Sequence, residues 1–213
     1  MKLYDFAFSP NCRKVRAVAY ELGVPLECVH IDLGRGASRA PSFLVLNPNG
    51  RVPVLQDGDF VLWESTAILR YLSAHRGGAL VPSGARAQAD MDRWIAWQLA
   101  HLGPALSKVA FERIAKKITG RGAPDEALIA AGTADFAQQS AILDAALDGR
   151  EYLAGTLSLA DFALASHYSL AETAGLDVAP HARIRGWLAR ILGRDSMKRA
   201  LADAQAAIRP NAA

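Results

Sequence analysis

The chain has 213 residues, of which 51% are hydrophobic, and its formal net charge is +3. This length and composition suffice for a large buried core, in one ordinary domain or two small ones. No apolar run approaches the ~20 residues of a membrane-spanning helix, and the first residues lead into no apolar signal segment, so we expect a soluble cytoplasmic protein. The basic residues are scattered, without a long stripe, which argues against nucleic acid as a partner.

The first part of the chain alternates strand and helix patterns. A strand pattern, a helical pattern that stops at Gly23 and a second strand pattern predict a βαβ unit with parallel strands. A short helix, two strands joined by the turn Asp57-Gly58-Asp59 and a further helix predict a hairpin followed by a helix. The expected elements are strands at 2–7, 26–32, 52–56 and 60–62, and helices at 11–22, 41–46 and 65–75. This βαβ-ββα order predicts a thioredoxin-like domain over residues 1–78.

The second part of the chain has only helical periodicity, which predicts an all-helical bundle over residues 85–213. The fold class is therefore α/β followed by all-α. The tetrapeptide from Ser158 to Asp161 is typical of a helix-capping box, to which we assign a folding role. The expected helices lie at 85–118, 125–147, 158–174, 184–192 and 196–207.

Pro53 lies inside the apolar run from Val52 to Leu55. Proline has no N–H to donate to a neighbouring strand, so the backbone N–H and C=O of the adjacent Val52 are left unpaired in the sheet. If the Val52–Pro53 peptide is cis, the Val52 N–H and C=O can pair with an extended ligand. A hairpin proline is the alternative. The pattern favours a binding site for a short peptide.

Glu64 and Ser65 stand at the start of a helical pattern. The N–H groups of a helix N-terminus and a serine hydroxyl can bind a carboxylate, and Glu64 can bind an ammonium group. An ordinary N-cap is the alternative. Together with Val52, these residues describe a receptor for a small zwitterionic peptide.

Ser9 ends the loop between the first strand and the first helix, where open α/β sheets bind their ligands. Its hydroxyl is a candidate helix cap, but it could also donate a hydrogen bond to a bound thiolate. Such a bond contributes about 1.5–3 kcal/mol, which lowers a thiol pKa by about one to two units. Cys12 is the competing nucleophile. It lacks a resolving partner, so we interpret it as a buried helix residue.

Two cysteines, Cys12 and Cys28, are too few to staple a chain with an adequate core, so both are expected to be reduced thiols. The five histidines have no paired metal-ligand spacing. We therefore predict no metal.

Four segments together resemble the cytosolic glutathione transferases. They are Ser9-Pro10-Asn11-Cys12-Arg13-Lys14-Val15, Asn47-Pro48-Asn49-Gly50-Arg51-Val52-Pro53-Val54-Leu55, Glu64-Ser65-Thr66-Ala67-Ile68 and Gly155-Thr156-Leu157-Ser158-Leu159-Ala160-Asp161. The resemblance spans essentially the whole chain and implies a glutathione-binding thioredoxin-like domain, a helical domain with the electrophile site, and a homodimer. The Ser9 loop is similar to that of the serine-type members, the theta and phi classes and their bacterial relatives.

This resemblance implies a role for each matching residue. Ser9 would activate the glutathione sulfur, the Val52 backbone would pair with the cysteinyl moiety, and Pro53 would be the cis proline. Glu64 and Ser65 would hold the γ-glutamyl group. Phi-type members place a His-Lys pair before the second helix, whereas this chain has Ser38-Arg39, so two cations remain candidates for the glycyl carboxylate: Arg39 and Arg51.

The electrophile site is expected to be apolar, with Phe8 as its best candidate and Trp97, Leu106 and Phe111 as weaker ones. The leading function is a transferase that adds the glutathione thiolate to hydrophobic electrophiles. Alternatives are a glutathione-dependent dehalogenase, β-etherase, peroxidase or isomerase, and a non-catalytic ligand-binding or interaction protein on the same scaffold.

Overall fold

The computed structural model describes residues 1–208 and divides them into two compact units. One unit comprises residues 1–79 together with the segment from Arg194 onward, and the other comprises residues 80–193. The first unit therefore contains the C-terminal helix, which the sequence pattern had placed in a helical domain over 85–213. The last five residues of that expected domain lie outside the described residues.

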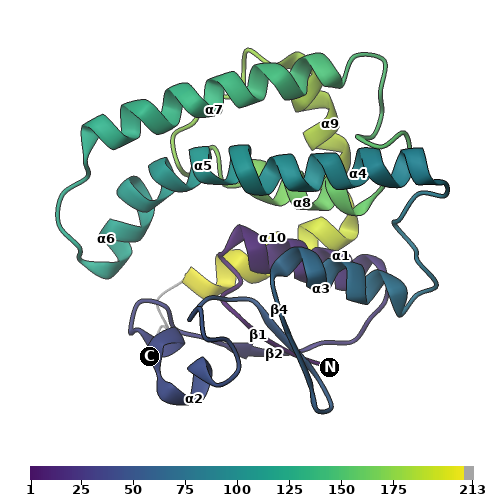
Figure 1. Cartoon of the computed structure of the whole chain (residues 1–213). Helices are drawn as coiled ribbons and strands as arrows, with labels where there is room; N and C mark the ends of the chain where they lie inside the picture. Colours follow the sequence, from purple (N-terminus) through teal and green to yellow (C-terminus); the bar gives the residue numbers. More distant parts are fainter. Residues whose placement is uncertain (209–213) are drawn as a thin grey trace. The chain divides into compact units, whose positions relative to one another are not determined.

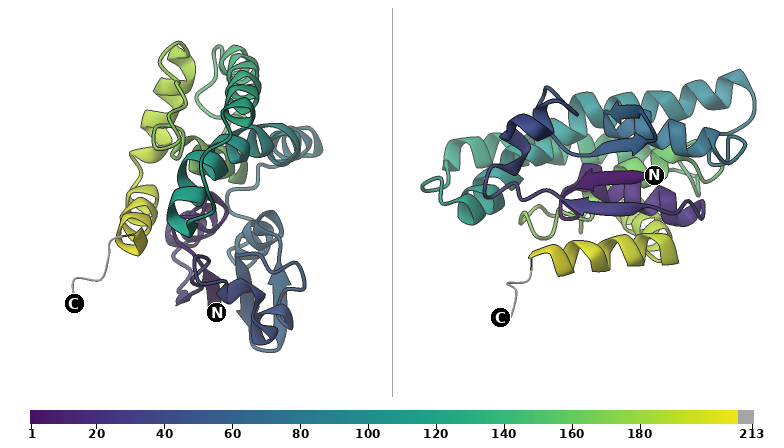
Figure 2. Two further views of the ribbon diagram at one scale, coloured as in Figure 1. Left: turned by 90° about the vertical axis from the view of Figure 1, so that its left-hand side faces the viewer. Right: turned by 90° about the horizontal axis from the view of Figure 1, so that it is seen from below.

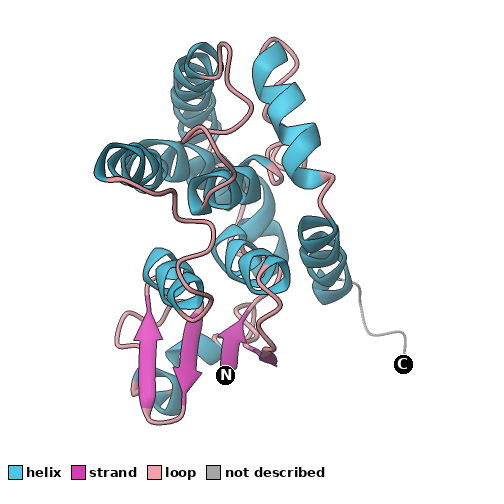
Figure 3. Cartoon of the chain, turned by 90° about the vertical axis from the view of Figure 1, so that its right-hand side faces the viewer, coloured by secondary structure: helices cyan, strands magenta, loops and turns pink. Residues whose placement is uncertain are grey.

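The first unit is built on a four-stranded sheet with the order β2-β1-β3-β4 (Figures 1 and 3). Strand β1 is parallel to β2 and antiparallel to β3, which in turn is antiparallel to β4. This topology confirms the predicted βαβ-ββα arrangement. Its elements are β1 (Lys2–Asp5), α1 (Pro10–Glu21), β2 (Glu27–His30), η1 (Ala37–Arg39), α2 (Pro41–Leu44), β3 (Val54–Asp57), β4 (Phe60–Trp63) and α3 (Ser65–Ala74).

Apolar side chains from β1, β3, α1 and α3 form the core of this unit. Leu3 of β1 and Leu55 of β3 are paired in the sheet and are at most 1% exposed. The helices contribute residues at helical spacing, and each fully buried side chain of this size stabilises the fold by about 1.5–3 kcal/mol. The helical members of the core are Val15, Val18, Ile68, Leu69 and Leu72. This core fixes the helix N-termini that carry the candidate site.

Helix α10 (Asp195–Ile208) packs against α1 (Figure 1). Ser196 donates a hydrogen bond to Glu21 at 2.5 Å, and Arg194 forms an ion pair with the same carboxylate. The Arg199 guanidinium lies 4.0 Å from the centroid of the Tyr20 ring. These polar contacts join α10 to α1. Helical periodicity does not specify which helix a segment packs against, so the sequence pattern did not place α10 with the first unit.

The second unit is entirely helical over its described residues, with α7 beside α5 (Figure 2). The predicted helix over 85–118 contains two π-helical segments. One of them immediately precedes Gly103 and Pro104, where the missing proline N–H interrupts the regular ladder. The elements are α4 (Ala85–Trp97), η2 (Gln98–Leu102), α5 (Gly103–Ala110), η3 (Phe111–Ala115), α6 (Lys116–Thr119), α7 (Glu126–Ala146), α8 (Leu159–Tyr168) and α9 (Ala182–Leu192).

Helix α8 is buried along its whole length and begins at the predicted capping box. Asp161 Oδ2 accepts hydrogen bonds of 2.9 Å from the Ser158 N–H and hydroxyl. The helix ends at Tyr168, six residues before the predicted end at Ala174. The chain there tightens into turns, in which the N–H groups of Leu170 and Ala171 each bond to the carbonyl three residues earlier.

Candidate functional site

Ser9 occupies the N-cap position of α1 with an extended backbone. Its N–H donates to the Phe6 C=O at 2.8 Å, and its own C=O accepts from the N–H groups of Cys12 and Arg13. The hydroxyl makes no capping hydrogen bond, in contrast to the capping alternative considered from the sequence. The backbone therefore holds the loop, and the hydroxyl is left for another role.

Cys12 is fully buried beside the Ser9 hydroxyl. Burial, and secondly the negative charge of Asp5, raise the pKa of its thiol to about 12, against weaker opposing effects that include the Ser9 contact. The thiol is thus protonated near neutral pH, which makes it a poor nucleophile. Its burial confirms the interpretation of Cys12 as a packed helix residue, and both cysteines are free, as predicted.

The Val52–Pro53 peptide bond is cis, as the resemblance implied. Strand β3 begins only at Val54, which pairs with Tyr4 and Trp63. Within residues 1–208, neither the Val52 N–H nor its C=O makes a hydrogen bond. A buried or half-buried backbone without partners is unusual, and here it offers one donor and one acceptor to an extended ligand.

The loop before Val52 is organised by Asn47, a residue that sequence reasoning missed. The Asn47 side chain is 3% exposed; its Nδ2 donates to the Arg51 C=O at 2.7 Å and its Oδ1 accepts from the Asn49 N–H at 3.0 Å. Gly50 has a φ of +60°, and a Cβ there would lie 2.8 Å from Arg39 Nη1. The signal was present in the dense Asn and Gly content of residues 47–50, which is typical of a tight turn.

Arg39 and Arg51 differ in how they approach this loop. Arg39 lies across Gly50, and its Nη1 donates to the Asn49 C=O at 3.3 Å. Arg51 is exposed, while its backbone C=O is held by Asn47. Arg51 thus precedes Val52 in the chain, while Arg39 is anchored through its guanidinium on the Asn49–Gly50 turn.

Glu64 stands immediately before α3 with a φ of 72° and a ψ of 108°. Positive φ is rare for residues with a side chain, and such strained positions cluster at ligand sites. Glu64 is exposed, and its C=O accepts from the Ile68 N–H at 3.0 Å. No sequence signal indicated this backbone conformation.

Asn11 connects the two helix starts of the candidate site. The buried Ser65 hydroxyl donates to Asn11 Oδ1 at 3.2 Å, which joins the first turn of α3 to that of α1. Both helix N-termini carry partial positive charge. In α1, Pro10 has no N–H, and the N–H groups of Cys12 and Arg13 bond to the Ser9 C=O.

Lys14 of α1 is fully buried and was not singled out from the sequence. Burial lowers the pKa of its ammonium group to about 7, and the negative charge of Glu64 is the main opposing effect. The negative charge of Glu64 therefore acts on this buried cation.

The expected electrophile residues are divided between the two units. Phe8, adjacent to Ser9, is half-buried, and its carbonyl accepts from Arg13 Nη2 at 3.1 Å. Trp97 packs edge-on against Trp94, and Phe111 is 42% exposed. Leu106 is 1% exposed in the core of the helical unit, so its assignment to the electrophile site was wrong: its apolar side chain is used for packing.

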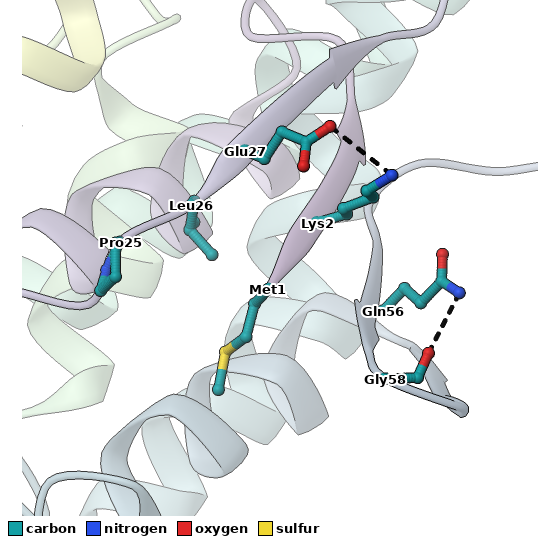
Figure 4. A pocket seen from close by; sticks show the side chains of 7 residues that line it. All are labelled: Met1, Lys2, Pro25, Leu26, Glu27, Gln56 and Gly58. Atoms are coloured by element: carbon teal, nitrogen blue, oxygen red, sulfur yellow. Dashed lines mark hydrogen bonds and ion pairs between the residues drawn. The ribbon is translucent and has the colours of Figure 1, made fainter.

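A hollow of about 570 Å³ lies elsewhere on the first unit (Figure 4). It is lined by Met1, Lys2, Pro25, Leu26, Glu27, Gln56 and Gly58. These residues surround the beginning of β1, whereas Ser9 follows its end. The hollow therefore shares none of the residues of the candidate site.

Among the described residues, no helix is long and apolar enough to cross a membrane. No group of three or more His, Cys, Asp or Glu side chains within residues 1–208 is placed to hold a metal ion.

The chain thus combines a thioredoxin-like unit that has a cis-proline loop with a helical unit. Residues 3–79 match the family model described as the N-terminal domain of glutathione S-transferase. Glutathione S-transferase 3 of Zea mays is 35% identical over 209 residues, which cover 95% of this chain and 93% of that protein. The chain therefore belongs to the glutathione S-transferase family and is a transferase.

Solved structures agree with this assignment. Glutathione transferase F7 from Populus trichocarpa has a TM-score of 0.87 and 26% identity, covering 95% of this chain and 98% of that one. A theta class glutathione S-transferase from Xanthomonas axonopodis pv. citri, solved with glutathione bound, has a TM-score of 0.86 and 31% identity, covering 93% and 95%.

Proposed function

We propose that the first unit binds glutathione along the Val52 backbone and the N-terminus of α3, and that Ser9 stabilises its thiolate for attack on a hydrophobic electrophile. The observation that carries this proposal is the unpaired Val52 backbone. It comes two residues before Val54, which pairs in the sheet with Trp63, and Trp63 is followed directly by Glu64 and Ser65 at the start of α3. The Val52 N–H and C=O would pair with the cysteinyl residue in the manner of an added strand.

The two ends of glutathione would be bound by opposite charges. The Glu64 carboxylate would accept hydrogen bonds from the γ-glutamyl ammonium group, while Ser65 and the N–H groups of α3 would bind the γ-glutamyl carboxylate. Arg39 is the better candidate for the glycyl carboxylate, because its guanidinium is already anchored on the Asn49–Gly50 turn. Arg51 would then extend toward solvent.

The chemistry would require little beyond making the nucleophile. The Ser9 hydroxyl and the N-terminus of α1 stabilise the thiolate after its proton has left, and both lower the pKa of the glutathione thiol. The sulfur electron pair then forms the bond to an electrophilic carbon while a leaving group departs or a conjugated system accepts the electrons. Holding the two reactants together contributes the remaining acceleration.

Replacement of Glu64 by Ala tests the placement of glutathione. The variant should weaken glutathione binding about ten-fold or more, because a charge-assisted contact contributes about 1.5–3 kcal/mol. Isothermal titration calorimetry measures this directly. Glu64→Gln is the matched control for charge, since it keeps the length of the side chain, and it should bind with intermediate affinity. Unchanged affinity in Glu64→Ala would refute the placement.

We further propose that the protein is a homodimer, as is typical of the family and of oligomers in general. An exposed aromatic side chain supports this proposal: Phe60 of β4 is 46% exposed, and its ring centroid lies 5.3 Å from that of the half-buried Tyr71 of α3. Exposed aromatic side chains are enriched in the core of protein interfaces.

Light scattering at micromolar concentration should give twice the mass of the chain for the wild type and a reduced mass for Phe60→Glu. Leu128→Glu is the matched control, since Leu128 of α7 is also 46% exposed but belongs to the other unit. A monomer mass for the wild type would contradict the dimer, and an equal effect of both variants would contradict the role of Phe60.

A further inference from the structure

An ion pair joins the two elements that flank the loop with Ser9. Asp5 is the last residue of β1 and Arg16 lies in α1, so the pair brackets the segment that contains the loop. Arg16 Nε lies 2.5 Å from Asp5 Oδ2, and Arg16 Nη2 donates to Asp5 Oδ1 at 2.9 Å. The Asp5 side chain is 1% exposed and the Arg16 side chain is 12% exposed. A buried two-point contact of this kind fixes direction as well as distance.

The pair lies close to the first turn of α1. The Cys12 thiol contacts the Ser9 hydroxyl, and the charges of Asp5 and Arg16 both act on the pKa of that thiol, in opposite directions. Cys12, which has no exposed surface, lies in the first turn of α1, between Ser9 and Arg16 along the chain. In a close-packed interior, a displacement of the pair is transmitted to its neighbours.

Helix α10 holds the outer side of Arg16. Asp203 Oδ2 accepts hydrogen bonds from Arg16 Nη1 at 2.9 Å and from the Tyr20 hydroxyl at 2.5 Å. The Asp203 side chain is 30% exposed, so this half of the network is more accessible than Asp5. Arg16 is therefore held from two sides, by the end of β1 and by the C-terminal helix.

We propose that Arg16 and Asp203 are positioning residues for Ser9: α10 fixes Arg16, Arg16 fixes Asp5 and the first turn of α1, and these hold the Ser9 hydroxyl toward the glutathione sulfur. The inference rests on the proposed role of Ser9 in the reaction. It adds a contribution from the C-terminal helix, whose Asp203 contacts Arg16 and Tyr20 of α1.

Asp203→Asn is the most informative variant, because it removes one charge at a partly exposed position and leaves the buried pair between Arg16 and Asp5 in place. We expect the thiol pKa of bound glutathione to rise by about half a unit and kcat below that pKa to fall about three-fold. The affinity for glutathione should change by less than about two-fold, since Asp203 is not among the residues proposed to bind glutathione. Ultraviolet absorbance of the thiolate against pH, steady-state kinetics and calorimetry measure the three quantities.

Two further variants separate positioning from folding. Asp195→Asn makes the same chemical change at a fully exposed position of α10, and it should leave the thiol pKa at the wild-type value even if it lowers the melting temperature. Arg16→Lys keeps the charge but loses the two-point contact, so it should raise the thiol pKa in the same direction as Asp203→Asn. A wild-type thiol pKa in both Asp203→Asn and Arg16→Lys would overturn the proposal.

A double-mutant cycle with Ser9→Ala distinguishes this proposal from the role of Ser9 itself. If Asp203 acts through Ser9, adding Asp203→Asn to Ser9→Ala should produce no further shift in the thiol pKa. A full additional shift would mean that Asp203 acts on the thiolate independently, which overturns the positioning role. A wild-type thiol pKa in Ser9→Ala alone would refute the proposed role of Ser9. A raised thiol pKa in Ser9→Ala with no change in Asp203→Asn would refute only the positioning role.

Discussion

Ser9→Ala should raise the thiol pKa of bound glutathione by about one to two units and lower turnover near neutral pH about ten- to a hundred-fold. The reason is the loss of one hydrogen bond to a charged sulfur, which contributes about 1.5–3 kcal/mol. Because the hydroxyl makes no capping bond in the structure, its removal should leave α1 intact. The affinity for glutathione should change far less than turnover. At a pH well above the raised pKa, much of the lost activity should return.

Cys12→Ala is the matched control, and it should retain most of the conjugating activity. The pKa of the Cys12 thiol is raised to about 12 by burial, so the residue contributes no thiolate at neutral pH. Both variants should be assayed against pH with a model aryl halide and with a mixed-disulfide substrate. Activity that survives in Ser9→Ala and vanishes in Cys12→Ala would assign the reaction to Cys12, and a mixed disulfide between Cys12 and glutathione would then be detectable as added mass.

The architecture of the first unit could be predicted because its signals are local. Strand patterns, the stop at Gly23 and the Asp57-Gly58-Asp59 turn gave the order of strands and helices that the sheet confirms. The assignment of α10 failed for a physical reason. Helix α10 is held against α1 by ion pairs of Glu21 and Asp203 with residues more than 170 positions away in the chain, as between Arg194 and Glu21. Periodicity carries no information on such pairing.

The residues of the proposed glutathione site were indicated by the sequence, but the residues that support them were not. Ser9, Val52 and Glu64 stand in recognisable motifs, and the structure gathers them in one unit. Asn47 and the positive φ of Glu64 emerged only from the backbone geometry. Leu106 was assigned to the wrong environment because an apolar side chain on a helix has the same sequence pattern whether it faces a ligand or the core.

The second large effect that we expect is on stability. Asp161 is fully buried, and its two oxygens accept hydrogen bonds from four donors: the N–H groups of Leu153 and Ser158, the Ser158 hydroxyl and Trp187 Nε1. The sequence predicted only the capping box, but the carboxylate also connects α8 to α9 through Trp187. Asp161→Ala should therefore lower the free energy of unfolding by about 3–5 kcal/mol, because it leaves several buried donors without partners.

Urea unfolding followed by tryptophan fluorescence measures this loss of stability. Two further variants measure the contributions of single donors to it. Trp187→Phe removes one donor while it keeps the aromatic packing, and it should cost about 1–2 kcal/mol. Ser158→Ala removes only the hydroxyl and should cost about 0.5–2 kcal/mol. A loss below about 1 kcal/mol in Asp161→Ala would contradict the network, because water would then have to satisfy donors that the fold encloses. The glutathione affinity of any Asp161 variant that folds should match the wild type, since the four donors all belong to the helical unit and the proposed glutathione site to the other.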